Sequence, residues 1–294
     1  MKHRVAGVVV SVALLAGCSA PGGRENRSDE GAHISVPPHD AETVDVSDNG
    51  GTKSVLLSPE DVVTLDARSD ELVRALGVEP IAAFAGETPD LDAAKKATPQ
   101  LVVTGAGHAV AAGDFEELEA ATGAVVIDIS PREGKPLDWE LVRQVQVLGK
   151  IFGKDDEAKQ LDDDFSEALE RASEAYQDSW KVALVRANGS AVAPLSPKES
   201  PLWEPVFTMV GMKEAEIEAD PDVVVVEERD PRGARADFVP ARKLLAEAYP
   251  DVAAIENCAV YVGPYSATDT ASIISYTLLL NEMEELFLSG VRVS

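Results

Sequence analysis

The sequence alternates short apolar runs with helical segments, and this alternation stops once and then starts again. Between residues 62 and 129, segments with apolar residues at helical spacing separate the runs 62–65, 81–84, 100–105 and 124–129. The alternation returns after residue 180, with apolar runs at 181–187, 221–228 and 259–264. Because short strands that alternate with helices are typical of βα units, each half is predicted to hold a mainly parallel sheet.

A long helix is predicted between the two halves. Residues 138–152 form one helix that ends at Gly153, and residues 154–179 then contain neither Gly nor Pro. Apolar residues recur there every three or four positions, which predicts a helix of about 36 Å at 1.5 Å per residue. The predicted fold class is therefore α/β, with two Rossmann-like lobes of mainly parallel sheets joined by one long helix. The expected boundaries are 53–153 for the N-terminal lobe, 154–179 for the inter-lobe helix and 180–294 for the C-terminal lobe.

The N-terminus carries a short apolar segment before the first of two cysteines. Lys2 and Arg4 precede an apolar run that ends at Leu15, which is shorter than the roughly 20 residues that span a membrane. The stretch "LLAGCSA" then resembles the lipobox of a bacterial lipoprotein signal. This resemblance implies that residues 1–17 are removed and that Cys18 carries a lipid, which places the protein outside the cytoplasm and anchors it to the cell membrane. An ordinary secretory signal with an incidental cysteine is the alternative.

Composition assigns the segment after Cys18 and excludes one class of partner. Residues 18–52 are rich in Ser, Gly, Pro and acidic residues, so we expect a flexible tether. The chain has a formal net charge of −26, which argues against nucleic acid as a partner because phosphate binding needs clustered cations. The second cysteine, Cys258, has no disulfide partner once Cys18 is lipidated, and we expect a buried, unreactive thiol.

Four stretches in this order resemble one family. They are "DELVRALGVEPIAAF", "TPDLDAAKKATPQLVVTG", "VRQVQVLGKIFGKDDEAKQL" and the pair "DPDVVVVEERDP" with "NCAVYVGP". Together they resemble the type III periplasmic binding proteins, the substrate-binding lipoproteins of iron-siderophore, haem and cobalamin ABC importers. The resemblance covers residues from about 60 to 290. It implies a binding protein, not an enzyme, that delivers a ferric siderophore to an ABC permease dimer and holds no permanent cofactor.

The resemblance also implies where ligand binds. Lobes joined by a helix of this kind barely hinge, and ligand lies between them at the carboxyl ends of the parallel strands, as in open α/β sheets generally. A ferric catecholate is anionic and has an aryl shell, so its site needs arginine and aromatic side chains. The loops at these strand ends hold Arg132, Lys135 and Lys198 in addition to the predicted ligand-binding residues. The predicted ligand-binding residues are Arg68, His108, Arg186, Trp203, Arg229, Arg232, Arg235 and Tyr265.

Two of these assignments have open alternatives. The arginines can instead neutralise neighbouring acids such as Glu227, Glu228, Asp230 and Asp237. His108, the only histidine of the predicted lobes, can be an ordinary hydrogen-bonded residue; if the ligand is haem, it can ligate the iron together with Tyr265. Haem or cobalamin is therefore the alternative ligand. One histidine cannot supply a bare zinc or manganese site, so no direct metal site is predicted.

The resemblance further implies one surface acid on each lobe that contacts the permease. Asp92 is at the matching position of the N-terminal lobe, and Glu199 or Glu204 of "PKESPLWEP" at that of the C-terminal lobe. An extracytoplasmic enzyme is the less favoured class, because the sequence has no phosphate-binding loop, no GxSxG elbow and no Cys/His pair. A lipoprotein receptor without a transporter also stays open.

Overall fold

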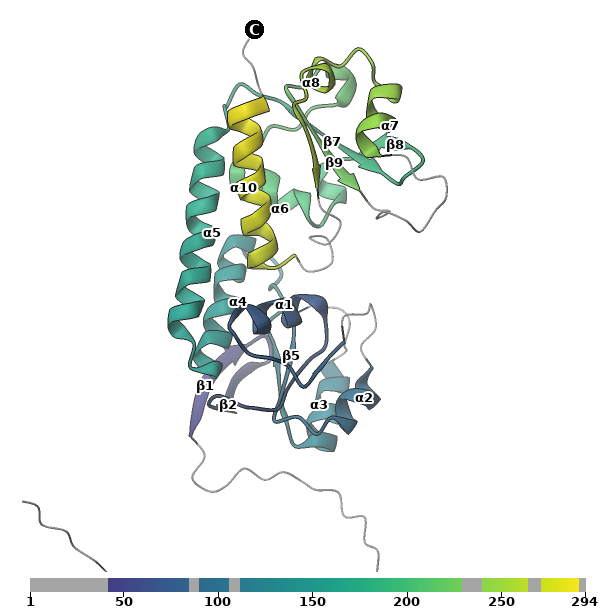
Figure 1. Cartoon of the computed structure of the whole chain (residues 1–294). Coiled ribbons are helices and arrows are strands. Elements are labelled where there is room, and N and C mark those ends of the chain that lie inside the picture. The colour runs from purple at the N-terminus through teal and green to yellow at the C-terminus, as the bar shows by residue number, and fades with distance from the viewer. Residues whose placement is uncertain (1–41, 85–89, 106–111, 229–239, 264–270, 291–294) are drawn as a thin grey trace, which may run out of the picture. The chain divides into compact units, whose positions relative to one another are not determined.

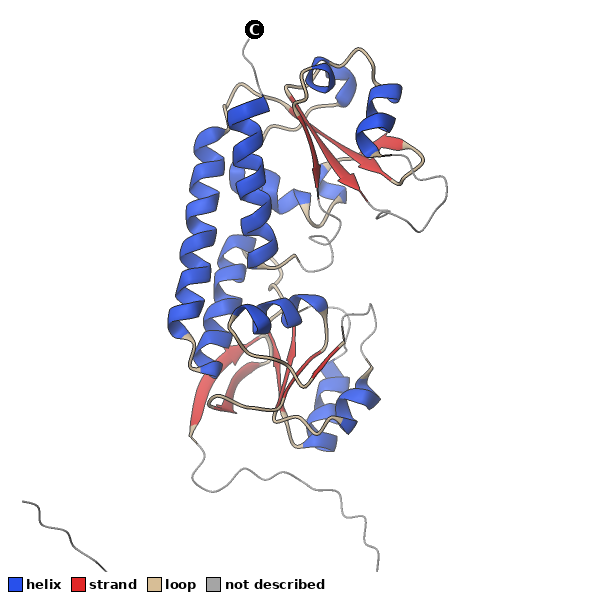
Figure 2. Ribbon diagram, viewed as in Figure 1, coloured by secondary structure: helices blue, strands red, loops and turns tan. Residues whose placement is uncertain are grey.

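The computed structural model describes residues 42–84, 90–105, 112–228, 240–263 and 271–290. These residues form two α/β lobes, each built on its own sheet, with helices α5 (Asp155–Ala175) and α10 (Ile273–Gly290) packed together beside them (Figures 1 and 2). The predicted fold class is confirmed. Among the described residues, no helix is both long enough and apolar enough to cross a membrane.

The N-terminal lobe is built on a parallel four-stranded sheet in the order β4-β3-β5-β6. Its strands are β3 (Val62–Thr64), β4 (Ala82–Ala83), β5 (Leu101–Thr104) and β6 (Val125–Asp128). Val62, Val63 and the whole of β5 are buried, as expected for a parallel sheet covered on both faces. The connecting helices are α1 (Ala67–Ala75), α2 (Leu91–Lys96) and α3 (Ala112–Thr122).

A hairpin precedes this sheet and corrects the predicted start of the lobe. Strands β1 (Thr43–Asp48) and β2 (Gly51–Leu56) pair antiparallel, so an ordered segment begins inside the range 18–52 that we assigned to a tether. Val46 and Val55 are buried in the main core, and the Lys150 ammonium of α4 (Leu137–Phe152) donates to the Asp45 carbonyl oxygen. The hairpin is stable because alternate side chains bury against α4, a local pattern that the polar composition of the whole segment hides.

The C-terminal lobe holds the second sheet, in the order β10-β9-β7-β8. Strands β7 (Val182–Ala187), β9 (Val223–Glu228) and β10 (Val260–Gly263) run parallel, and β8 (Val192–Pro194) is an antiparallel edge strand. Four consecutive valines of β9, at 223–226, are fully buried. Helices α7 (Ala241–Ala248) and α8 (Ala253–Glu256), α6 (Trp203–Val210), and the 3₁₀ turns η1 (Pro197–Glu199) and η2 (Ile217–Ala219) complete the lobe.

Two helices connect the lobes. Helix α5 packs against α4 of the N-terminal lobe and α6 of the C-terminal lobe, and α10 packs along α5 and contacts α1. Helix α4 ends at Gly153, whose φ of 63° is the left-handed conformation that favours glycine at a helix end. Phe165, Ala168 and Ala172 of α5 and Tyr276 and Phe287 of α10 belong to one buried cluster. The expected inter-lobe helix is therefore present, and α10 accompanies it.

Candidate ligand-binding site

In the N-terminal lobe, Asp66 ties together the carboxyl ends of β3 and β5. The buried Asp66 carboxylate caps α1 by accepting from the Ser69 backbone N–H at 2.9 Å. Its second oxygen accepts from the Thr104 hydroxyl at 3.1 Å and from the Gly105 backbone N–H at 2.7 Å. A single carboxylate thus fixes the start of α1 beside the end of β5.

Arg68 is held on this edge of the N-terminal sheet. Its Nη1 donates to the Gly105 carbonyl oxygen at 3.1 Å, and a methyl group on Gly105 would lie 3.3 Å from the Arg68 Cδ. The pKa of Arg68 is lowered chiefly by burial, while Tyr276 and Asp66 act in the opposite direction. Burial also raises the pKa of Tyr276, and the positive charge of Arg68 opposes that rise. Arg68 is therefore a partly buried cation at the carboxyl end of β3.

The carboxyl edges of the two sheets are joined by contacts between α1, which follows β3, and α10, which follows β10. The Glu71 carboxylate accepts hydrogen bonds from the hydroxyls of Ser272 and Ser275, the latter at 3.0 Å. Both serines are buried at the start of α10. Since these bonds join the two lobes at the ends where their parallel strands stop, any ligand at these ends lies near both lobes.

In the C-terminal lobe, Arg186 and Glu227 are neighbours at the carboxyl end of the sheet. They are register partners on the parallel strands β7 and β9, and the Arg186 Nε donates to the Glu227 Oε1 at 2.9 Å. The Glu227 side chain is 2% exposed and the Arg186 side chain 31% exposed. The Ser200 hydroxyl donates to the other carboxylate oxygen of Glu227. Arg186 thus has a partly exposed side chain, and its guanidinium lies beside a buried, hydrogen-bonded carboxylate.

Trp203 lies behind this pair. Its ring is fully buried at the start of α6 and meets the Tyr261 ring edge-on at a centroid distance of 5.8 Å. A methyl group on Gly263 would lie 3.1 Å from the Trp203 Cζ2, so the ring closely covers the end of β10. We expected Trp203 to offer its ring to a ligand, but in this structure the ring packs in the interior and supports the strand ends.

Several predicted residues lie outside the part of the chain that the structure describes. His108, Tyr265 and Cys18 are among them, together with Arg229, Arg232 and Arg235. The axial ligation of haem by His108 and Tyr265 therefore stays an expectation. Among the residues that are described, no group of three or more His, Cys, Asp or Glu side chains could hold a metal ion.

The predicted permease-contacting acids have distinct environments. Asp92 is exposed in the first turn of α2. Glu199 is exposed but accepts from the Ser196 backbone N–H at 3.1 Å, in a capping box that holds η1. Glu204 is exposed on α6 and lines a pocket of about 240 Å³. Within the described part of the chain, the Glu204 carboxylate accepts no hydrogen bond of the kind by which Glu199 stabilises its turn.

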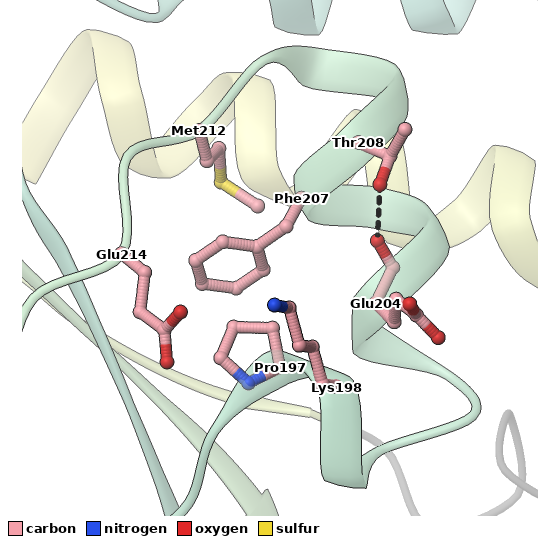
Figure 3. A pocket seen from close by; sticks show the side chains of 7 residues that line it. All are labelled: Pro197, Lys198, Glu204, Phe207, Thr208, Met212 and Glu214. Carbon is pink, nitrogen blue, oxygen red and sulfur yellow. Dashed lines mark hydrogen bonds between the residues drawn. The ribbon is translucent and has the colours of Figure 1, made fainter.

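The pocket beside Glu204 has an apolar base and a charged rim. Figure 3 shows Lys198, Glu204 and Glu214 around the Phe207 ring, with the Met212 thioether next to that ring. A hollow of about 490 Å³, lined in part by Glu199, adjoins it through the shared Glu214. Acidic side chains outnumber the single lysine in the pocket of Figure 3, so its rim favours a cationic group.

Sequence reasoning missed Asp66 and Ser200, and it named Glu227 only as one of several acids that the arginines could neutralise. Each is polar and buried at the carboxyl end of a strand or at the start of the following helix. One signal was available: in "VVVVEE" an acid follows four valines at the end of a strand, where only a paired carboxylate can be buried. The sequence does not indicate that the partner is Arg186, because this pairing depends on the register between β7 and β9.

Two lobes of this topology, with polar groups at the carboxyl ends of both sheets, define a bilobal ligand-binding protein. The sequence matches the family described as "Periplasmic binding protein" over residues 42–221. The chain belongs to this family, which is one of binding proteins and not of enzymes. No curated protein matches the chain.

Solved structures share the fold at low sequence identity. The siderophore-binding protein BauB, bound to two acinetobactin molecules and ferric iron, is 18% identical with a TM-score of 0.68, covering 84% of this chain and 99% of its own. The catecholate-siderophore binding protein VctP from Vibrio cholerae is 15% identical with a TM-score of 0.65, covering 83% and 100%. The petrobactin-binding protein YclQ from Bacillus subtilis is 16% identical with a TM-score of 0.66, covering 84% and 99%. These matches establish the fold.

Proposed function

We propose that this protein binds a ferric siderophore at the carboxyl ends of its two sheets and delivers it to an ABC importer. The observation that carries the proposal is Arg186, a positively charged and partly exposed side chain at the carboxyl end of β7 in a chain of net charge −26. A cation kept at this edge of an acidic protein suits an anionic ligand. Arg68 supplies a second cation at the matching edge of the other lobe. The structures of BauB and VctP, which bind siderophores, support the ligand class.

A fluorescence titration tests the ligand. Trp203 lies next to the Arg186–Glu227 pair, so we expect tryptophan emission to change when a chelate binds. The mature protein is titrated with ferric acinetobactin, ferric petrobactin, a ferric hydroxamate, haem and cobalamin. Saturable quenching by a ferric siderophore supports the proposal. No response to any iron chelate, together with tight binding of haem or cobalamin, would overturn it.

We propose the remaining ligand contacts from the arginine-rich segment after β9. Arg229, Arg232 and Arg235 follow this strand within a few residues, and a ferric catecholate offers several anionic oxygens. Each lost charge-assisted hydrogen bond costs about 1.5–3 kcal/mol, so Arg229→Ala combined with Arg232→Ala should weaken binding more than tenfold. An unchanged dissociation constant would show that these arginines serve only their acidic neighbours.

We propose that Glu204, not Glu199, is the permease-contacting acid of the C-terminal lobe. Glu199 already holds a turn, whereas Glu204 lies at the rim of a pocket with an apolar base that can receive the stem of a basic side chain. Asp92 is the proposed counterpart on the N-terminal lobe. In cells that carry the importer, Glu204→Ala should reduce uptake of the ferric siderophore without changing its dissociation constant. The control Glu170→Ala, an exposed acid on α5, should leave uptake unchanged; equal uptake by both variants contradicts the assignment.

We also propose that a lipid on Cys18 tethers the protein to the outer face of the cell membrane. The support is the lipobox-like stretch "LLAGCSA". Cys18→Ala should release the protein into the soluble fraction. Retention of the variant in the membrane fraction would refute the anchor.

A further inference from the structure

Arg132 and Arg143 contact the buried Glu140, and Arg186 contacts the buried Glu227. The three arginines differ in how many of their guanidinium nitrogens donate hydrogen bonds. Arg132 donates through Nε to both oxygens of Glu140, at 2.9 and 3.1 Å, and through Nη2 at 2.6 Å. Arg143 donates through Nε to Glu140 at 2.8 Å, and its Nη2 donates to the carbonyl oxygens of Ile129 and Ser130. These two guanidinium groups are engaged in holding the N-terminal lobe together.

Among the described residues, the Arg186 guanidinium makes its hydrogen bond through Nε alone. Its Nε donates to Glu227 at 2.9 Å, while its Nη2 is buried and has no hydrogen-bond partner among the described residues. A buried donor without an acceptor is costly, typically about 1–3 kcal/mol, and such groups are rare in native proteins. A planar guanidinium fixed at Nε presents its two Nη nitrogens as a fork, the geometry that binds a carboxylate or another pair of oxygens bidentately.

Glu227 is itself fixed by a second contact. The Ser200 hydroxyl donates to Glu227 and accepts from the Trp203 backbone N–H at 3.2 Å. The Ser200 carbonyl oxygen also accepts from the Glu204 backbone N–H at 3.0 Å. A continuous series of hydrogen bonds therefore runs from the first turn of α6 through Ser200 and Glu227 to Arg186. Because Glu227 is 2% exposed, solvent cannot replace either contact without disturbing the packing.

From this arrangement we infer that Glu227 is a positioning residue, which with Ser200 orients Arg186 so that its Nη fork is free for an anionic ligand oxygen. The inference rests on the proposed function in one respect, that Arg186 contacts the ligand. It differs from simple charge neutralisation in its consequence. A neutralising Glu227 weakens the attraction of Arg186 for an anion, so its removal should tighten binding. A positioning Glu227 aids binding, so its removal should weaken it.

The test is a double-mutant cycle with ferric acinetobactin or whichever ferric siderophore the titration above identifies. Arg186→Ala should raise the dissociation constant about tenfold or more, since the charge-assisted hydrogen bond to the ligand is lost. Glu227→Gln should raise it by a smaller factor, because the single amide oxygen can accept only one of the two hydrogen bonds that the carboxylate accepts from Arg186 and Ser200. If Glu227 acts through Arg186, the double variant should bind no more weakly than Arg186→Ala alone. Tighter binding by Glu227→Gln, or additive losses in the double variant, would overturn the inference.

Two further measurements separate the inference from the proposed function and from misfolding. Ser200→Ala keeps the charge of Glu227 and removes its hydrogen bond from the Ser200 hydroxyl, together with the bond that this hydroxyl accepts from the Trp203 N–H. It should also raise the dissociation constant, by a smaller factor. In the ligand-free protein, the Arg186 Nε–H resonance should exchange slowly with water, and Glu227→Gln should accelerate that exchange. Fast exchange in the unmodified protein refutes the positioning role whatever the ligand is. A change in exchange without any effect of Arg186→Ala on binding refutes instead the assignment of Arg186 to the ligand.

Discussion

Gly149 sets the distance between α4 and α5 at the turn where the N-terminal lobe meets the inter-lobe helix. A methyl group on Gly149 would lie 2.5 Å from the Ala158 Cβ and 3.1 Å from the Lys154 carbonyl oxygen. Both neighbours are fixed, one as a buried alanine and the other as backbone, so no flexible side chain can move aside. Gly149→Ala should therefore force the two helices apart.

The size of the effect follows from two opposing contributions. Replacing glycine by alanine inside a helix stabilises it by about 1 kcal/mol. Overpacking a tight contact costs typically about 1–3 kcal/mol, and a carbon–carbon separation of 2.5 Å is far inside the favourable range of about 3.5–4.0 Å. Taking the upper end of the overpacking cost, the variant should lose about 2 kcal/mol of unfolding free energy. For a chain of this size that lowers the melting temperature by roughly 4–8 °C.

Urea unfolding followed by far-UV circular dichroism measures the loss, and a compensating variant controls for it. Ala158→Gly alone should be destabilising, because it lowers helix propensity by about 1 kcal/mol and removes a buried methyl group. Combined with Gly149→Ala, it moves one methyl group from α5 to α4 and removes the closer of the two contacts, so the double variant should be more stable than Gly149→Ala alone. The reasoning is refuted if Gly149→Ala is as stable as the unmodified protein, or if the second substitution gives no recovery.

Three more predictions follow from buried contacts. Bonds from Arg132 and Arg143 outweigh burial and lower the pKa of Glu140, so its stabilisation is present above the unfolded-state pKa and is lost as the pH falls through the folded-state value. Glu140→Gln should therefore lower the unfolding free energy by about 3 kcal/mol at neutral pH. The difference in unfolding free energy between the variant and the unmodified protein should shrink below about pH 4. If urea unfolding gives a difference that does not change with pH, the prediction is wrong. Gly263→Ala, whose methyl group would press on the Trp203 ring, should shift tryptophan emission and cost about 1–3 kcal/mol, and unchanged emission and stability would argue against that contact. Asp66→Ala should cost about 2 kcal/mol and Asp66→Asn less, because asparagine still caps α1; equal losses by thermal unfolding would exclude the cap as the cause.

The sequence predicted the elements that depend on local patterns. Strands β3, β5, β7 and β9 coincide with continuous apolar runs, and the end of α4 coincides with Gly153. The hairpin of β1 and β2 escaped prediction because its few alternating valines lie in a segment of polar composition. Cys258 was expected to be buried before β10, but it is exposed and takes a φ of 60° at the turn after α8. The backbone conformation of this turn depends on the path of the chain after α8. The general tendency of cysteine to be buried does not predict that path.

The location of the candidate site could be predicted from the sequence, but the pairing of its charged residues could not. That arginines gather after the strands of the C-terminal lobe could be seen in the sequence, and Arg186 is placed at the carboxyl end of β7. That Glu227 and not another acid contacts Arg186 follows from the register of two strands 41 residues apart. The sequence suggests Trp203 as an aromatic residue that contacts the ligand, but helix α6 turns its ring inward against Gly263. The direction in which a helical side chain points is set by the tertiary packing of the helix. That packing cannot be derived from a single sequence.

Helix α10 follows both lobes in the sequence, and this order has a consequence for how the protein folds. Phe287 packs against Tyr176 and Trp180 at the end of α5, and Ser272 binds Glu71, which lies 201 residues earlier. Contacts between such distant segments form late and slow the folding of a chain. The N-terminal lobe and α5 are synthesised well before α10, so the apolar surface that α10 covers stays exposed until α10 has been synthesised. We therefore expect a truncated chain that ends before α10 to aggregate, and the complete chain to acquire both lobes in a single late step.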